Sequence, residues 1–329
     1  TYCSLAYVLG DGEPETIPVS LGGKSTLLRS VVHFPDEQPQ ASRTRDVDDL
    51  VIGDEARQLA PMGGRLLQNF KPLLSRKLTR SSLDIEVVKE EGDWKNWKWD
   101  GLAQALSRPD TEMRVRILRR TEPFVHMYRR FHPWEIELAV EAIFRHLAKQ
   151  AETYTGIAHP DQIVVGVPAE ANDIFRKRIV DAVLAANWVN ERRQVLLVPE
   201  PLAIALRYGI KLDEAQTLLV FDYGGGTLDL SCIDIEPATA STPLRVNVRA
   251  SKQLDKAGMY LDWVLLRDVI GKKQPDWWER AGLTHVSEVL SNWVRGPTLL
   301  EEVERLKHEL SEFEEAHFSF LEFGLDLSV

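Results

Sequence analysis

Residues 217–230 read TLLVFDYGGGTLDL, and this stretch decides the fold. An apolar strand runs up to Asp222, three glycines follow at 224–226, and a second strand starts at Leu228. Glycines accept positive φ and leave room beside the backbone, so several N–H donors can converge on an anion such as phosphate. A carboxylate before the turn suits water-bound Mg²⁺ better than phosphate itself. We predict a phosphate hairpin in which Asp222 orders the metal through water and Thr227 adds a hydroxyl. The alternative is a hairpin whose glycines serve only the turn.

Length, charge and cysteine content restrict the class of protein. At 329 residues the chain exceeds the roughly 250–300 residues at which a single core stops growing, so we expect two lobes. A net charge of −10 argues against nucleic acid or an anionic membrane as partner, because Lys and Arg hold phosphate backbones. No apolar run approaches a membrane span and no signal-peptide pattern is visible, which indicates a cytoplasmic protein. Cys3 and Cys232 are too isolated for a disulfide framework or a thiolate zinc site.

Strands and helices alternate through the middle of the chain. The periodicity predicts a helix from Pro133, strands over 163–167 and 195–198, and a helix after each strand, the first capped by Asn172. The buried stripe of the 133–154 helix is expected to be Ile136, Val140, Ile143, Leu147, Ala151 and Tyr154. Such alternation is typical of an α/β sheet that binds ligands at the carboxyl ends of its strands. Three polar or special residues lie at such ends, namely Pro168, Glu200 and Asp222.

The N-terminal segment predicts short strands and loops. A hairpin turn is expected at 10–12, with strands over 16–19 and 29–34. Residues 21–26, LGGKST, look like part of a P-loop, but that pattern needs a glycine where Pro18 stands, and proline has no N–H to give. We interpret 21–26 as a loop. The least regular region, about 80–130, carries Trp94, Trp97 and Trp99 beside several glutamates, which favours a satellite core over a base-stacking surface.

Near the C-terminus the pattern predicts a helix over about 298–312. Its apolar side is Leu299, Val303, Leu306 and Leu310. Its other side carries Glu304, Lys307, His308 and Ser311. That polar side is either a solvated face or the lining of a ligand cleft.

Taken together, these stretches resemble the nucleotide-binding domain of the 70-kilodalton heat-shock (DnaK-like) chaperones, within the actin-like ATPase superfamily. The likeness rests on four segments in the family's order and spacing: VPAEANDIFR at 167–176, PEPLAIALRYG at 199–209, FDYGGGTLDL at 221–230 and ERLKHELS at 304–311. Segments 22–34 and 70–77 are similar to the family's first lobe.

The resemblance implies a two-lobed actin-like ATPase (ribonuclease H-like) α/β fold. Residues 1–214 would form the first lobe, including a variable inserted subdomain at about 80–130. Residues 215–329 would form an incomplete second lobe, with the phosphate hairpin at 222–229 and the adenine-side helix at about 298–312. We also interpret the sequence as truncated at both ends, because it starts at Thr1 and its last residues read as part of a strand.

The resemblance also implies residue roles around ATP or ADP and Mg²⁺. Lys71 would stabilise charge on the γ-phosphate, Glu200 would orient the attacking water, and Asp222 and Thr227 would complete the catalytic set. The implied nucleotide contacts are Thr1, Gly224, Gly225, Gly226, Gly258, Glu304, Lys307, His308 and Ser311. Pro168 and Arg176 match the family's switch that relays the nucleotide state to the substrate-binding domain. Client proteins, a co-chaperone and a nucleotide-exchange factor would be the partners.

Three departures from the family pattern bear on activity. The Asp-x-Gly-Thr motif that precedes the position of Thr1 is absent, residues 256–262 keep only Gly258 of a glycine pair and lose an acidic pair, and His308 replaces the usual arginine. The leading interpretation is the ATPase domain of a stress-response chaperone, which hydrolyses ATP to ADP and phosphate. The second is a degenerate nucleotide sensor or scaffold. A sugar or acetate kinase is disfavoured, because the chaperone-like segments extend well beyond the phosphate loops.

Overall fold

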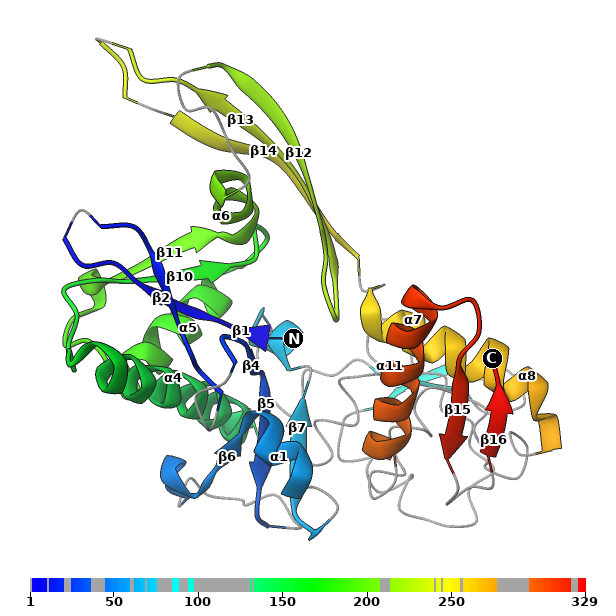
Figure 1. The fold of residues 1–329 in the computed structure, drawn as a ribbon. Helices are drawn as coiled ribbons and strands as arrows, with labels where there is room; N and C mark the ends of the chain where they lie inside the picture. Colours follow the sequence, from blue (N-terminus) through cyan, green and yellow to red (C-terminus); the bar gives the residue numbers. More distant parts are fainter. Residues whose placement is uncertain are drawn as a thin grey trace. The chain divides into compact units, whose positions relative to one another are not determined.

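The computed structural model describes residues 2–10, 12–20, 25–36, 45–59, 62–68, 70–75, 85–88, 94–97, 131, 133–207, 214–239, 241–243, 245–254, 257–276, 296–320 and 325–329. These residues belong to two compact units, shown as a ribbon in Figure 1. The first unit takes in those within 1–79, 130–222 and 229–253, and the second those within 80–129, 223–228 and 254–329. Helices and strands are mixed in both, so the predicted α/β class is confirmed.

The first unit begins with short antiparallel strands. They are β1 (Tyr2–Cys3), β2 (Leu5–Tyr7), β3 (Glu15–Ile17), β4 (Leu28–Arg29), β5 (Val31–Phe34), β6 (Val51–Ile52) and β7 (Arg65–Gln68). The predicted hairpin is confirmed, because β2 pairs with β3 and Gly10 takes a φ of +60° between them. Strand β5 is buried throughout and lies between β6 and β7. Helix α1 (Gly53–Leu59) follows β6, and two 3₁₀ turns, η1 (Val47–Asp49) and η3 (Lys71–Ser75), flank this region.

A fully buried ion pair fixes α4 (Pro133–Thr155) to β7. The guanidinium of Arg65 donates to both carboxylate oxygens of Glu135, at 2.6 and 3.1 Å, and neither side chain is exposed. Arg65 also donates to the Asp36 carbonyl at 2.8 Å, and its guanidinium lies over the rings of Phe34 and Phe131. These contacts satisfy the two charges inside the core.

The alternating segments of the first unit largely follow the prediction. They are α4, β10 (Ile163–Val167), α5 (Asp173–Ala185), η4 (Arg192–Gln194), β11 (Val195–Pro199) and α6 (Glu200–Arg207). Asn172 caps α5, since its side-chain oxygen accepts from the Phe175 N–H at 3.0 Å. The stripe of α4 is buried from Ile136 to Ala151, but Tyr154 is 53% exposed, so its assignment to the core was wrong. Tyr154 instead packs edge-on against the ring of Tyr7.

The strands after α6 form a sheet of their own. β10 and β11 form a parallel pair by themselves, whereas β12 (Gln216–Tyr223), β13 (Leu228–Glu236) and β14 (Arg245–Leu254) form a separate three-stranded sheet, seen in Figure 1 as a long twisted ribbon. One face of this sheet packs through Val220, Ile233 and Ile235 against Ala205 of α6. The predicted pair of strands on either side of the glycine turn is confirmed, because β12 and β13 are neighbours in this sheet.

The second unit contains a helical layer and two small hairpins. Its elements are β8 (Ile85–Val88), β9 (Trp94–Trp97), α7 (Gly258–Val264), the π-helix η5 (Leu265–Ile270), α8 (Gly271–Lys273), α11 (Gly296–Glu312), β15 (His317–Phe320) and β16 (Leu325–Ser328). α7, η5 and α8 run on as one helical segment, and α11 packs on it and on the β15–β16 hairpin (Figure 1). The predicted apolar stripe of α11 is confirmed: Leu299, Val303 and Leu306 are buried beside Phe318.

Across the described ranges, no helix is both long and apolar enough to cross a membrane. Most of the predicted inserted subdomain at 80–130, including Trp99, lies outside the described residues, as do residues 21–24. The predicted lobe boundary between 214 and 215 stays a prediction.

Candidate functional site

In the first unit, the structure brings together two of the predicted catalytic side chains. Lys71 is the first residue of η3, and Glu200 is the first residue of α6, directly after β11. The Nζ atom of Lys71 lies 2.7 Å from Oε1 and 3.0 Å from Oε2 of Glu200. The two side chains remain 36% and 30% exposed. A ligand can therefore reach both a cation and a carboxylate at this point.

Gly166 and Cys3 complete the surroundings of this pair. Gly166 of β10 lies beside the Glu200 side chain: a Cβ at Gly166 would lie 3.5 Å from Cγ of Glu200, which is an ordinary van der Waals contact. Burial raises the pKa of the Cys3 thiol, and the charges of Lys71 and Glu200 also act on it. Its Sγ lies 3.2 Å from Oγ of Ser30. A thiol whose pKa is raised is a poor nucleophile, so Cys3 is not a candidate nucleophile here.

In the second unit, the glycine-rich turn has the predicted position but not the predicted backbone. The Gly224 N–H donates to the Thr227 carbonyl at 2.9 Å, which closes the turn between β12 and β13. None of Gly224, Gly225 and Gly226 has a positive φ, so a left-handed conformation does not explain these glycines. Asp222 lies one residue before the end of β12 and is half-buried.

The start of α7 approaches the backbone of this turn closely. The N–H of Gly258, the first residue of α7, donates to the Gly224 carbonyl at 3.1 Å. A Cβ on Gly258 would lie 3.2 Å from the Gly225 carbonyl oxygen and 3.3 Å from the Gly225 Cα. Glycine at 258 thus lets the start of α7 pack directly on the turn. The glycine turn and the segment around Gly258, which the sequence analysis predicted as separate nucleotide contacts, lie against each other.

The polar side of α11 reaches the same element through Lys307. Its Nζ lies 2.6 Å from Oδ1 of Asp262 in α7 and 3.4 Å from the Gly258 carbonyl oxygen. Burial raises the pKa of the Asp262 carboxyl, and Lys307 acts in the opposite direction. Sequence reasoning treated 256–262 as a departure from the family pattern and missed Asp262, although its place one helical turn after Gly258 was a usable signal.

The other predicted residues of α11 are also accessible. Glu304 is half-buried, whereas His308 and Ser311 are exposed, and the Ser311 hydroxyl donates to the His308 carbonyl at 2.6 Å. Among the predicted contacts, Thr1 lies outside the described residues. The predicted residues thus fall into two groups, one in each unit: Lys71, Glu200 and Asp222 in the first, and the glycine turn with Thr227, Gly258 and the α11 side chains in the second.

Pro168 and Arg176 meet at one residue. The Pro168 carbonyl accepts from the Ala171 N–H at 3.0 Å, and Nε of Arg176 donates to the Ala171 carbonyl at 3.0 Å. Arg176 therefore holds the loop between β10 and α5 rather than extending freely from the helix. Any movement of that loop would involve both residues.

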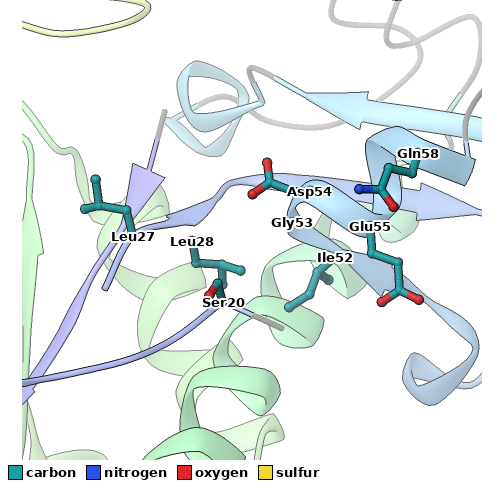
Figure 2. Close-up of a pocket in the computed structure, with 8 residues that line it drawn as sticks. All are labelled: Ser20, Leu27, Leu28, Ile52, Gly53, Asp54, Glu55 and Gln58. Atoms are coloured by element: carbon teal, nitrogen blue, oxygen red, sulfur yellow. The ribbon is translucent and has the colours of Figure 1, made fainter. Parts of the chain in front are cut away.

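A pocket in the first unit lies apart from these residues. Figure 2 shows its lining of Ser20, Leu27, Leu28, Ile52, Gly53, Asp54, Glu55 and Gln58. Asp54 forms an ion pair with Arg29 at 2.9 Å. None of the predicted site residues lines it, and its carboxylates do not suit a phosphate.

The donor set agrees with a metal held through water. The described residues contain no cluster of three or more side chains that could ligate a metal directly. Mg²⁺ keeps several of its waters and commonly needs only one or two carboxylates beside a phosphate. The single half-buried carboxylate of Asp222 fits that mode of binding.

Comparison with known proteins gives consistent matches. A family model described as "Hsp70 protein" matches residues 109–323, more than half of the chain. The chain is 29% identical to the "Chaperone protein dnaK1" of Prochlorococcus marinus subsp. pastoris over 263 residues, 77% of this chain and 33% of the relative. It is 31% identical to the protein of the same name from Parasynechococcus marenigrum over 233 residues, 70% of this chain and 29% of the relative. The chain thus spans about a third of the length of these curated relatives.

Proposed function

The chain belongs to the Hsp70 family, and from this premise we propose that it is the part of a DnaK-like chaperone that binds and hydrolyses ATP. The observation that carries the proposal is the ion pair of Lys71 and Glu200, two accessible side chains 129 positions apart in the sequence. In this proposal the chain has the two lobes of an actin-like ATPase, residues 1–214 and 215–329.

The proposed chemistry is hydrolysis of ATP to ADP and phosphate. The ammonium of Lys71 stabilises the charge that develops on the γ-phosphate, and the carboxylate of Glu200 orients the attacking water. The backbone of the glycine turn and the hydroxyl of Thr227 hold phosphate oxygens. Asp222 would hold Mg²⁺ through water, and the bound metal would neutralise phosphate charge. Positioning and charge stabilisation supply most of the catalysis in this reaction class.

The adenosine side of the proposed site is α11. Glu304, Lys307, His308 and Ser311 offer donors and acceptors to the ribose and the base, and Gly258 is assigned to the nucleotide beside the turn on which it packs. Thr1 is assigned to the phosphates. The exposed imidazole of His308 can stack on adenine, with less cation–π attraction than an arginine would give.

Coupling to client proteins is the proposed purpose of the hydrolysis. Pro168 and Arg176 would relay the nucleotide state, and their shared contact at Ala171 supports a joint role. Clients, a co-chaperone and a nucleotide-exchange factor are the proposed partners, rather than nucleic acid or membrane. A cytoplasmic location and a role in the stress response belong to the same proposal.

Turnover measurements on the full-length protein test the proposal. We expect Lys71→Ala to lower the rate of ATP hydrolysis about 10²-fold, because a donor to the developing charge is lost, and Thr227→Ala to lower it roughly tenfold. Lys177→Ala removes an exposed lysine of the same unit, 70% accessible and ion-paired with Asp181, and serves as the matched control. Unchanged turnover in both site variants would refute these roles.

A nucleotide sensor or scaffold without useful hydrolysis is the second candidate. It is favoured by His308 in place of an arginine and by the altered segment 256–262. Titration calorimetry combined with a phosphate-release assay separates the two candidates. Binding of ATP without release of phosphate would support the sensor.

A further inference from the structure

We infer that Asp262 is a positioning residue, which holds the ammonium of Lys307 against Gly258 and so links α11 to the glycine turn. The inference rests on the proposed function, because it concerns the same nucleotide site. It adds Asp262, which was not among the predicted contacts. It also adds a physical connection between the adenosine side and the phosphate side of that site.

The first step is the contact between Asp262 and Lys307. The two charged atoms lie 2.6 Å apart, and the side chains are only 12% and 20% exposed. An exposed ion pair contributes little to stability, so a lysine at a protein surface usually stays mobile. Here the pair is largely removed from solvent, so the carboxylate restricts where the ammonium can lie.

The second step joins Lys307 to the turn. Its Nζ reaches the Gly258 carbonyl oxygen at 3.4 Å, and the N–H of the same Gly258 donates to the Gly224 carbonyl. Gly258 is therefore held on both sides, by the lysine of α11 and by the glycine turn. Because Gly258 has no side chain, α7 can pack closely on the turn: a Cβ at position 258 would lie only 3.2 Å from the Gly225 carbonyl oxygen.

The third step concerns the charges around Asp262. Glu304 and His308, on the same side of α11 as Lys307, both act on the Asp262 carboxylate, the former opposing and the latter favouring its charge. Asp262 is thus a largely buried acid on which three predicted nucleotide contacts of α11 act. Substituting it would change the position of Lys307 without removing any group assigned to the nucleotide.

A double-mutant cycle in the full-length protein tests the inference, with ADP as the probe. We expect Asp262→Asn and Lys307→Gln each to weaken ADP binding about tenfold in calorimetry. Because the carboxylate acts through the lysine, the double variant should bind no more weakly than Lys307→Gln alone. Glu302→Gln breaks an exposed ion pair of α11 with Arg305 and should leave ADP affinity unchanged.

Two results would overturn the inference. One is a double variant whose loss equals the product of the two single losses, because Asp262 would then act independently of Lys307. The other is unchanged ADP affinity in Asp262→Asn, with its far-UV circular dichroism and unfolding midpoint close to those of the parent.

Amide hydrogen exchange without nucleotide separates this inference from the proposed function. If the parent protein fails to bind ADP, the proposed function falls, but the link can still be judged at the Gly258 amide. Faster exchange there in Asp262→Asn, and not in Glu302→Gln, supports the link from Lys307 to the turn. Equal exchange in the parent and in Asp262→Asn rejects it.

Discussion

Lys71 and Glu200 form a two-pronged ion pair that joins η3 to the first residue of α6. Because both side chains keep about a third of their surface exposed, the pair contributes at most about 1 kcal/mol to stability. Such a small gain in stability does not explain why the two charges are held together, whereas binding of a ligand by both side chains would explain it. Substitutions in this pair can therefore distinguish a catalytic role, which affects turnover, from a structural role, which affects stability.

Glu200→Gln should lower ATP turnover about 10²-fold and change the unfolding free energy by no more than about 1 kcal/mol. The amide keeps the shape of the side chain but cannot accept a proton from water. Turnover and urea unfolding of the full-length protein measure the two effects. Asp181→Asn, in an exposed ion pair of the same unit, is the control. A large loss of stability with unchanged turnover would assign Glu200 to the scaffold.

Gly258→Ala should destabilise the second unit by about 1–3 kcal/mol and weaken ADP binding. The new Cβ would meet the backbone of Gly225, which cannot turn aside as a flexible side chain would. Gly156→Ala provides a control: φ there is +74° but a Cβ would meet nothing, so only backbone strain of about 1 kcal/mol is expected. Calorimetry with ADP and urea unfolding distinguish them. Equal ADP affinity in both variants would contradict a tight contact at 258.

Local features of the fold were predictable because they depend on neighbouring residues. The Asn172 cap, the stripe of α4 and the Gly10 hairpin each follow from a few positions in sequence, and the structure confirms them. The prediction that Tyr154 is buried was wrong, because a residue in the last turn of a helix need not lie over the core. The glycine turn was found correctly, but the close packing of Gly258 on it joins residues more than thirty positions apart in the sequence.

Long-range contacts were not predictable from local pattern. The sequence pattern alone did not bring Lys71 to Glu200; only the family resemblance suggested it. Asp262 was missed because its importance depends on Lys307, in a different helix. The packing of β12 on α6 depends on which faces find apolar partners, here Ala205 for Val220. Charged residues are seldom buried, so Arg65 and Glu135 gave no signal of their meeting.

The buried pair of Arg65 and Glu135 predicts a strong effect on stability. Glu135→Ala should destabilise the first unit by about 3–5 kcal/mol, because the guanidinium stays buried without its partner. The double variant Arg65→Met, Glu135→Leu should recover most of that loss, since apolar side chains of similar volume suit the ring environment of Phe34 and Phe131. Urea unfolding measures both. A single variant as stable as the parent would mean that this pair contributes nothing to the fold.

The raised pKa of Asp262 predicts a pH dependence of stability with a definite sign. Burial raises the pKa of this carboxyl above its ordinary 3.8, so the folded state binds its proton more tightly than the unfolded state does. The parent should therefore lose stability relative to Asp262→Asn as the pH rises from 3.8 through the folded pKa, and the difference should then become constant. Urea unfolding of both proteins at several pH values measures it.

Three neighbours of Asp262 on α11 carry charge, namely Glu304, Lys307 and His308. Repeating the comparison in a His308→Gln background removes the imidazole from this set, and the direction should stay the same. A difference that grows in favour of the parent as the pH rises would mean that the attraction of Lys307 outweighs burial. In that case the ion pair stabilises the second unit at neutral pH, and the position of Lys307 would be held more firmly than burial alone implies.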